Sequence, residues 1–163
     1  GIPLFVSNSF SKSFSLYGER VGALSVVAAS QDEAARVLSQ LKRIVRANYS
    51  NPPTHGGKIV ATVLGSAALR SRWEEELAGM RERIRKMRQE LVEQIQARVP
   101  GADFSFVIRQ RGMFSYSGLS KDQVRRLHEE FSVYAIDTGR ICVAALNSHN
   151  VEHVAQSIAK VIV

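Results

Sequence analysis

Apolar side chains recur every three or four residues in the middle of the chain, and this is its clearest pattern. The recurring positions are Trp73, Leu77, Met80, Ile84, Met87, Leu91 and Ile95. This spacing places all of them on one face of an α-helix, where they are typical of core packing. We therefore predict one continuous helix over 68–98, about 45 Å long at ~1.5 Å per residue, which Pro100-Gly101 ends.

Two shorter apolar runs come before this helix. Residues 3–9 and 21–29 are rich in apolar and β-branched side chains, which indicates two strands of a buried sheet. The segment between them, 10–20, is polar and contains glycine. We expect it to form the loop that joins the two strands.

Two further helices are expected between the strands and the long helix. Asp32 is placed to cap a helix that runs to about Asn48. Its apolar face would consist of Ala35, Leu38, Leu41 and Val45. Asn51-Pro52-Pro53 interrupts the chain, and Gly56-Gly57 precedes a helical stretch over roughly 58–69.

Short strands are expected after the long helix. Residues 103–108 and 113–117 favour two strands around a turn at 109–112, and 140–145 favours a third.

Helices alternate with these strands. Ser120-Lys121-Asp122-Gln123 resembles a capping box, so we expect a helix from there through Phe131. A final amphipathic helix is expected over 147–162, with Val151, Val154, Ile158 and Val161 facing inward. Alternating strands and helices predict a compact α/β lobe over 99–163.

Composition and charge narrow the class of protein. The chain has 163 residues, 45% of them hydrophobic and 23% charged, which is typical of an ordinary globular core. No apolar run approaches the ~20 residues that a membrane span requires. The net charge is +7, and its densest basic cluster consists of Arg81, Arg83, Arg85, Lys86 and Arg88. Because glutamates interleave with this cluster, we predict a solvated helix face and no nucleic-acid partner. The lack of a long apolar run predicts no membrane partner.

The single cysteine, Cys142, excludes an internal disulfide framework and fits a reducing, cytoplasmic location. It lies in the apolar run 141–145, which favours a buried structural thiol over a nucleophile. The opening residues, 1–6, resemble a β-strand entered midway more than a signal peptide. We therefore expect the chain to begin inside a larger protein.

One segment carries the most specific chemistry. It reads Ser9-Phe10-Ser11-Lys12-Ser13-Phe14-Ser15-Leu16-Tyr17-Gly18-Glu19-Arg20-Val21-Gly22. Taken singly, Lys12 and Arg20 fit an exposed loop lysine and a solvated arginine. Taken together, Arg20 with the hydroxyls of Ser9 and Ser11 offers donors for a phosphate monoester. Lys12 offers an amine that can form a Schiff base with an aldehyde, so the loop meets the requirements of pyridoxal 5'-phosphate.

The same segment resembles the cofactor-lysine segment of the aspartate and aromatic-amino-acid aminotransferases, which are pyridoxal-phosphate enzymes of fold type I. The matching pattern is Ser-x-Ser-Lys followed by Leu-Tyr-Gly-Glu-Arg-Val-Gly. The resemblance implies that Lys12 is the Schiff-base lysine and proton shuttle. It implies that Ser9, Ser11 and Arg20 hold the cofactor phosphate. Tyr17 fits a place near the cofactor and simple packing equally well.

Three later segments extend the resemblance. Residues 45–56 are similar to the family segment whose arginine, here Arg46, reaches the partner subunit's site and meets the distal carboxylate of a dicarboxylic substrate. By itself, Arg46 also fits an arginine that neutralises the helix dipole. Residues 110–115 imply that Phe114 lies over the substrate. Residues 139–144 imply that Arg140 binds the substrate α-carboxylate, a role that suits a bidentate guanidinium on a rigid strand.

The histidines do not indicate a metal site. His149 and His153 have a spacing that can bind zinc on a helix, but no cysteine or carboxylate ligand accompanies them. We predict no metal, and we interpret His55 and His128 as structural.

The resemblance implies an α/β architecture in three parts: the end of a large cofactor-binding domain over 1–67, a long connecting helix over 68–98 and a small α/β domain over 99–163. In the family, an aspartate for the pyridine nitrogen, a tyrosine for the phenolic oxygen and a Gly/Ser-rich phosphate loop precede the lysine segment. No segment of this chain matches them, so we expect a large part of the subunit to lie outside it.

The implied reaction is transamination in a homodimer, with amino acids and 2-oxo acids as substrates. Residues 8–12 and 17–20 look closer to the bacterial aromatic (tyrosine) aminotransferases, which favours an aromatic amino acid with 2-oxoglutarate. An aspartate aminotransferase is the nearest alternative. A non-enzymatic interaction or dimerisation module is the main rival from another class. Another pyridoxal-phosphate reaction, such as decarboxylation, is disfavoured because both Arg46 and Arg140 are present.

Overall fold

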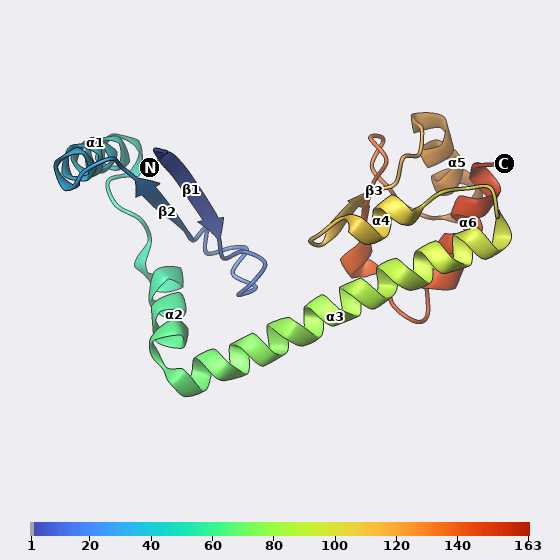
Figure 1. Cartoon of the computed structure of the whole chain (residues 1–163), viewed down its shortest axis with the longest axis horizontal. Coiled ribbons are helices and arrows are strands. Elements are labelled where there is room, and N and C mark those ends of the chain that lie inside the picture. Colours follow the sequence, from blue (N-terminus) through green and yellow to red (C-terminus); the bar gives the residue numbers. More distant parts are fainter. Residues whose placement is uncertain (1) are drawn as a thin grey trace. The chain divides into compact units, whose positions relative to one another are not determined.

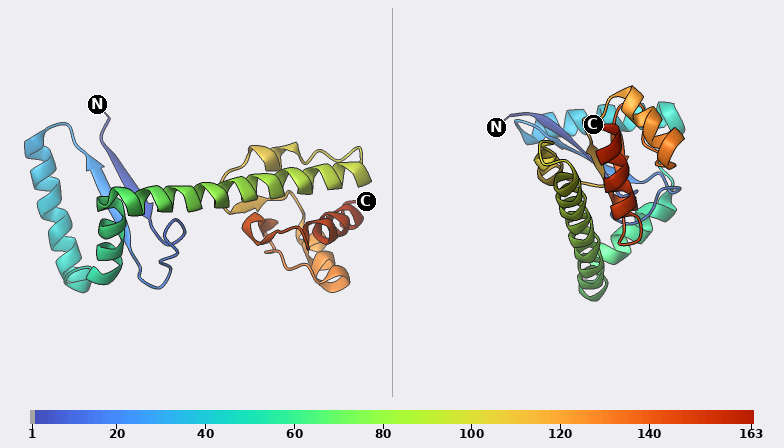
Figure 2. Two further views of the ribbon diagram at one scale, coloured as in Figure 1. Left: turned by 90° about the horizontal axis from the view of Figure 1, so that it is seen from below. Right: turned by 90° about the vertical axis from the view of Figure 1, so that its right-hand side faces the viewer.

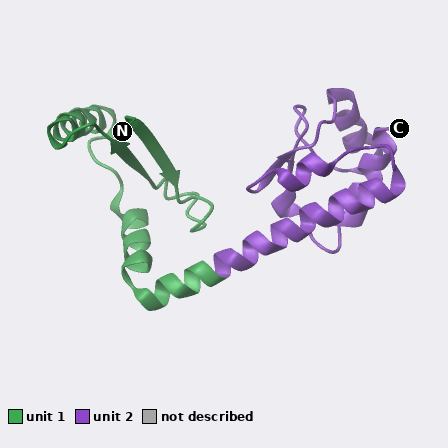
Figure 3. Cartoon of the chain, in the orientation of Figure 1, with its two compact units in different colours: residues 1–75 green, residues 76–163 purple. Residues whose placement is uncertain are grey.

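The computed structural model describes residues 2–163, and the chain divides into two compact units (Figure 3). The first is Gly1–Glu75 and the second Glu76–Val163. The boundary lies within the longest helix, α3 (Ala67–Arg98), which confirms the helix predicted from the apolar stripe to within one residue. Within 2–163, no helix combines the length and the apolar character needed to cross a membrane.

The first unit begins with an antiparallel hairpin (Figure 1). Strand β1 (Leu4–Ser9) pairs with β2 (Gly22–Val27) along its whole length, from Leu4 opposite Val27 to Ser9 opposite Gly22. Both strands and the loop between them were predicted. The prediction that the strands are buried was wrong for this chain, because the described sheet contains only these two strands and nearly every residue in them is exposed.

Helix α1 (Gln31–Tyr49) follows the hairpin. Its N-cap is Ser30 and not Asp32, because the Ser30 hydroxyl accepts a 3.2 Å hydrogen bond from the backbone N–H of Glu33. Asp32 lies in the first turn, where a carboxylate favours the positive end of the helix dipole. Of the predicted apolar face, Leu41 and Val45 are partly buried, whereas Ala35 and Leu38 are exposed.

Helix α2 (Thr54–Gly65) starts earlier than predicted and includes the glycine pair. Gly56 is buried against the loop between the strands, where an added Cβ would lie 2.8 Å from the Cβ of Glu19. The absent side chain therefore lets α2 approach that loop closely. Ser66 separates α2 from α3, so the predicted stretch 58–69 spans parts of two helices.

The second unit is built on the carboxy-terminal part of α3, whose buried residues are Met87, Arg88, Leu91, Val92 and Ile95. After α3 comes α4 (Ser105–Arg109), a short helix where a strand was predicted. That prediction was wrong because the Asp103 carboxylate accepts a 2.8 Å hydrogen bond from the N–H of Ser105, which favours a turn into helix over an extended strand.

Strand β3 (Phe114–Tyr116) pairs antiparallel with β4 (Arg140–Cys142), with Phe114 opposite Cys142 and Tyr116 opposite Arg140. The 3₁₀ helix η1 (Val143–Ala145) replaces the second half of the strand predicted over 140–145. Cys142 is exposed, so the prediction of a buried thiol was wrong. The alternation of β4 places Ile141 toward the core and Cys142 on the open face.

Helices α5 (Lys121–Phe131) and α6 (Val151–Val161) lie side by side in the second unit (Figure 2). The capping box at Ser120 and Gln123 is present as predicted. Helix α6 begins at Val151, four residues later than predicted, because Asn147 and Asn150 form a turn through the Asn150 side chain. The core of the unit draws residues from α3, α4, α5, η1 and α6, among them Leu91, Val107, Leu127, Val143 and Ile158.

Candidate functional site

The loop between β1 and β2 gathers two cationic side chains around Tyr17. The ammonium nitrogen of Lys12 lies 4.7 Å from the centre of the Tyr17 ring. The guanidinium of Arg20 donates a 3.1 Å hydrogen bond to the Tyr17 carbonyl. Both cations are exposed. Tyr17 therefore contacts both Lys12 and Arg20. These contacts come in addition to the simple packing role that was considered for Tyr17.

The two serines lie at the base of the same loop. The Ser9 hydroxyl donates to the Ser11 hydroxyl at 3.1 Å, and the N–H of Ser11 donates to the Ser9 oxygen at 3.3 Å. One rung beyond the β1–β2 ladder, the N–H of Phe10 donates to the Val21 carbonyl at 3.2 Å. Ser9 and Ser11 flank Phe10, and Arg20 precedes Val21. This rung therefore brings the backbones of all three predicted phosphate-binding residues to one place.

The backbone of the loop is held in an uncommon conformation. Arg20 has a φ of 50° and Ser15 a φ of 56°, in the left-handed region that residues other than glycine rarely adopt. Such conformations persist where surrounding contacts impose them, and they cluster at functional sites. The hydrogen bond from Arg20 to Tyr17 is one such contact.

Trp73 of α3 holds the segment that follows Lys12. Its indole N–H donates a 2.7 Å hydrogen bond to the Ser13 carbonyl, and its ring stacks on Phe14 at 4.7 Å between centroids. Phe14 in turn meets Phe10 edge to face at 5.5 Å. From the sequence, Trp73 was expected only to pack in the core. The available signal was the aromatic pair four residues apart, Phe10 and Phe14, which requires an apolar partner.

Glu19 connects the loop to α2. Its carboxylate lies 2.9 Å from Nδ1 of His55, and Gly56 packs against its Cβ. His55 thus joins α2 to the loop.

The donor set of the loop fits a phosphorylated aldehyde. Two hydroxyls 3.1 Å apart and the guanidinium of Arg20 on the same loop are donors that can bind an anionic phosphate, and the exposed amine of Lys12 lies on that loop too.

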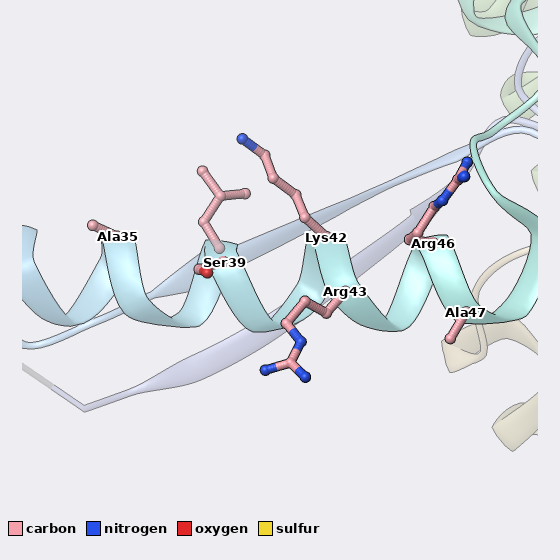
Figure 4. Close-up of a pocket in the computed structure, with 7 residues that line it drawn as sticks. Ala35, Ser39, Lys42, Arg43, Arg46 and Ala47 are labelled. Atoms are coloured by element: carbon pink, nitrogen blue, oxygen red, sulfur yellow. The ribbon is translucent and has the colours of Figure 1, made fainter.

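Arg46 lies in the last turn of α1, where its guanidinium donates to the Ser50 hydroxyl. Figure 4 shows it on a shallow surface along one side of α1 together with Ser39, Lys42 and Arg43. All residues lining this surface belong to α1. It is thus an open, basic helix face and not an enclosed site.

Phe114 and Arg140 lie together on the β3–β4 pair. The guanidinium carbon of Arg140 is 4.9 Å from the centre of the Phe114 ring, within the range of a cation–π contact. Both side chains are exposed, whereas Ser115 between the strand's two aromatics is buried. The structure thus brings the two predicted substrate-binding residues of the second unit into contact, on the open face of the pair.

Arg88 is a residue that sequence analysis missed. It was counted in the basic cluster assigned to a solvated face, but it is only 3% exposed. Its guanidinium donates to the carbonyls of Val107, Gly112 and Phe114, each at 2.9 Å, and to the Ser115 hydroxyl. Burial, and then the nearby Arg111, lower the pKa of Arg88 from its usual value. The signal was its position four residues after Ile84, which lies on the apolar stripe.

Within residues 2–163, no group of three or more histidine, cysteine or acidic side chains is arranged to hold a metal ion. His153 instead makes a 2.9 Å contact through Nε2 with the Phe131 carbonyl, which joins α6 to the end of α5.

Comparison with known proteins identifies the family. The model of the aminotransferase class I and II family matches residues 1–158, and the chain belongs to this family. It is 64% identical to an aspartate aminotransferase of Pseudomonas aeruginosa and 55% identical to an aromatic-amino-acid aminotransferase of Escherichia coli. Each comparison covers 99% of this chain and 41% of the relative.

A solved structure gives the same result. The aromatic-amino-acid aminotransferase of Burkholderia pseudomallei, covalently bound to pyridoxal phosphate, matches with a TM-score of 0.94 and 65% identity. This match covers 99% of this chain and 41% of that one. The chain therefore spans about two fifths of the length of the relatives it matches.

Proposed function

We propose that the chain is part of a pyridoxal 5'-phosphate-dependent aminotransferase in which Lys12 holds the cofactor. The observation that carries the proposal is the loop in which Tyr17 meets both Lys12 and Arg20. Membership of the aminotransferase family supports it, as does the pyridoxal phosphate bound covalently in the relative from Burkholderia pseudomallei. This support favours an enzyme over the alternative of an interaction module.

When bound, pyridoxal phosphate supplies an aldehyde that combines with amines and a ring that accepts electrons from the substrate Cα. Arg20 and the hydroxyls of Ser9 and Ser11 would bind its phosphate. Lys12 would hold the cofactor until an amino acid displaces it. As a free amine, Lys12 would then move the proton at the substrate Cα.

The substrate residues follow from charge and shape. Arg140 would bind the α-carboxylate that every amino-acid substrate carries, and Phe114 would pack over the substrate. Arg46, on the open face of α1, would bind the distal carboxylate of a dicarboxylic substrate in the partner subunit of a homodimer. We propose amino acids and 2-oxo acids as substrates, in an enzyme of the reducing cytoplasm.

Within this class we propose an aromatic amino acid and 2-oxoglutarate as the substrate pair, on the similarity over 8–12 and 17–20. The alternative is an aspartate aminotransferase, which is the name of the Pseudomonas aeruginosa relative. We also keep the proposed division into a cofactor domain over 1–67, a connecting helix over 68–98 and a small α/β domain over 99–163.

The test uses the full-length protein that contains this chain. It is assayed for amino transfer from phenylalanine, tyrosine and aspartate to 2-oxoglutarate, and its bound cofactor is trapped by borohydride reduction and located by peptide mapping. We expect transfer from the aromatic donors and a label on Lys12. Faster transfer from aspartate than from either aromatic donor would favour the alternative. Absence of transfer from all three would refute the proposal.

A further inference from the structure

Four hydrogen bonds of one buried side chain hold the segment 107–115, which includes the strand that carries Phe114. The Arg88 guanidinium binds the Val107 carbonyl in α4 and the Gly112 carbonyl in the following turn. It also binds the Phe114 carbonyl and the Ser115 hydroxyl in β3. A single planar group therefore holds a short helix, a turn and a strand together.

Two further sets of contacts hold β3 at its edges. One edge pairs with β4. At the other edge of β3, the Gln110 side chain makes the two hydrogen bonds that a neighbouring strand would make. Its amide donates to the Tyr116 carbonyl at 3.0 Å, and its oxygen accepts from the Tyr116 N–H at 2.8 Å. Arg88 thus links β3 to α3 by hydrogen bonds, while Gln110 and β4 hold β3 within its own plane.

Packing alone does not explain an arginine at this position. The neighbouring core positions on the same helix, Met87, Leu91 and Ile95, are apolar. In the described part of the chain, the hydrogen-bond partners of Arg88 are neutral oxygens and none is a carboxylate. A buried cation without an ion-pair partner is unfavourable unless its donors are satisfied. Only the five-donor guanidinium fork can reach four acceptors spread over this segment.

The hydrogen bonds of Arg88 position Phe114 and Arg140, the two residues proposed to bind the substrate. Arg88 binds the backbone of Phe114 directly, and the Phe114 ring lies 4.9 Å from the Arg140 guanidinium. Since β3 and β4 are paired at Phe114–Cys142 and Tyr116–Arg140, a shift of β3 relative to α3 would move both side chains.

We propose that Arg88 is a positioning residue for substrate binding: it locks the backbone of 107–115 so that Phe114 and Arg140 hold their arrangement before a substrate arrives. Arg88 does not touch the substrate in this proposal. The inference rests on the proposed roles of Phe114 and Arg140. Its structural part, the locking of 107–115, stands independently of those roles.

The decisive variant is Arg88→Lys in the full-length protein, because it keeps the positive charge and loses the fork. We expect KM to rise roughly tenfold, the equivalent of one charge-assisted hydrogen bond, for amino-acid and oxo-acid substrates alike. We expect kcat to change less than KM, and the absorption of the bound cofactor to be retained. The control is the same substitution at a second arginine, Arg126→Lys. Arg126 donates to the carbonyls of Val161 and Lys160 and to the Glu130 carboxylate, and none of these hydrogen bonds goes to β3.

A core control separates positioning from general loss of stability. Leu127→Ala opens a cavity in the same core but removes none of the four hydrogen bonds that Arg88 makes to 107–115. If Leu127→Ala raises KM as much as Arg88→Lys does, Arg88 is only structural and the proposal fails. If Arg88→Lys does not fold, Ser115→Ala removes one acceptor alone and is expected to raise KM by a smaller factor for both substrate classes. An unchanged KM in that variant would refute the proposal.

Hydrogen–deuterium exchange distinguishes this proposal from the proposed function. Arg88→Lys should speed exchange in peptides covering 107–117, with peptides covering 121–131 unchanged. If the wild type shows no transaminase activity but this local change is seen, the function proposed for the protein fails while the locking of 107–115 is retained. If exchange over 107–117 is unchanged, the role of Arg88 is refuted whatever the activity.

Discussion

The indole N–H of Trp73 donates a 2.7 Å hydrogen bond to the carbonyl of Ser13, the residue that follows Lys12. Sixty residues of sequence separate the two partners. A loop lysine in the role proposed for Lys12 needs a fixed backbone on both sides. Before Lys12, pairing of β1 with β2 fixes the backbone. After Lys12, the backbone is fixed by the hydrogen bond from Trp73 and by the stacking of the Trp73 ring on Phe14.

Replacing Trp73 therefore tests how the lysine loop is held. Trp73→Phe keeps an aromatic ring against Phe14 and removes the hydrogen bond, so we expect a loss of about 1 kcal/mol in unfolding free energy. Amide exchange over 13–16 should accelerate in the same variant. Leu69→Ala, on an exposed position of the same helix, is the control and should change neither. Equal exchange rates in Trp73→Phe and the wild type would show that Trp73 does not hold the loop.

Removing the Lys12 amine should abolish amino transfer in the full-length protein. Lys12 is exposed, so Lys12→Ala should leave the melting temperature of the cofactor-free protein almost unchanged, and the borohydride-trapped label should disappear. The control is Lys42→Ala, which removes another exposed lysine, on α1. This variant should keep both the activity and the label. A label recovered on Lys42 or Lys58 in the wild type would contradict the assignment of Lys12.

If Arg140 and Arg46 have the roles proposed for them, replacing each should affect a different set of substrates. Arg140→Ala should weaken every substrate, because each carries an α-carboxylate. Arg46→Ala should weaken dicarboxylic substrates and nearly spare aromatic ones. We expect each lost charged contact to reduce kcat/KM by about 2–4 kcal/mol in free energy, measured with aspartate and phenylalanine as separate donors. Equal losses for both donors in Arg46→Ala would contradict its proposed role.

The glycine pair of α2 provides a test of the packing beneath the loop. A Cβ at Gly56 would lie 2.8 Å from the Cβ of Glu19 and 3.1 Å from a Val21 methyl, whereas Gly57 has nothing within 4 Å of a built Cβ. Gly56→Ala should destabilise the protein by about 1–3 kcal/mol because the loop must move. Gly57→Ala should stabilise it by about 0.4–1 kcal/mol through a less flexible unfolded chain. Denaturant unfolding of both variants gives the comparison, and a similar change in the two would refute the close approach.

Local patterns in the sequence were sufficient to predict the elements whose stabilising contacts lie close together in the chain. The apolar stripe predicted α3 within one residue, and the capping box predicted α5, because both are encoded within a few turns of helix. The prediction of a strand over 103–108 was wrong for an equally local reason. The side-chain hydrogen bond of Asp103 competes with an extended backbone, and periodicity does not reveal it.

Burial and contacts between distant segments were harder to predict. Apolar residues on both faces of a strand predict that it is buried, but whether it is covered depends on elements far away in the sequence. Arg88 was assigned to solvent because glutamates surround it in sequence, yet it is buried by a turn around residue 112 that no helical pattern describes. The site residues Lys12, Arg20 and Arg140 were selected by motif. The contacts that hold them, through Tyr17, Trp73 and Phe114, came only from the structure.

The exposed hairpin leads to the last prediction, which concerns the 163-residue chain by itself. Its strands carry large exposed apolar side chains, with Phe5 67% and Leu24 52% exposed, and the two-stranded sheet has unpaired edges. Apolar edges of this kind pair with further strands, so we expect the chain to self-associate at micromolar concentration. A lysine on an edge strand opposes such pairing, and Val6→Lys combined with Leu24→Lys should shift the chain toward monomer in sedimentation velocity. Tyr134→Lys, at a residue 77% exposed in the second unit, adds one lysine elsewhere and should leave the association unchanged. If Tyr134→Lys disperses the chain as well as the hairpin variant does, net charge and not the hairpin governs association.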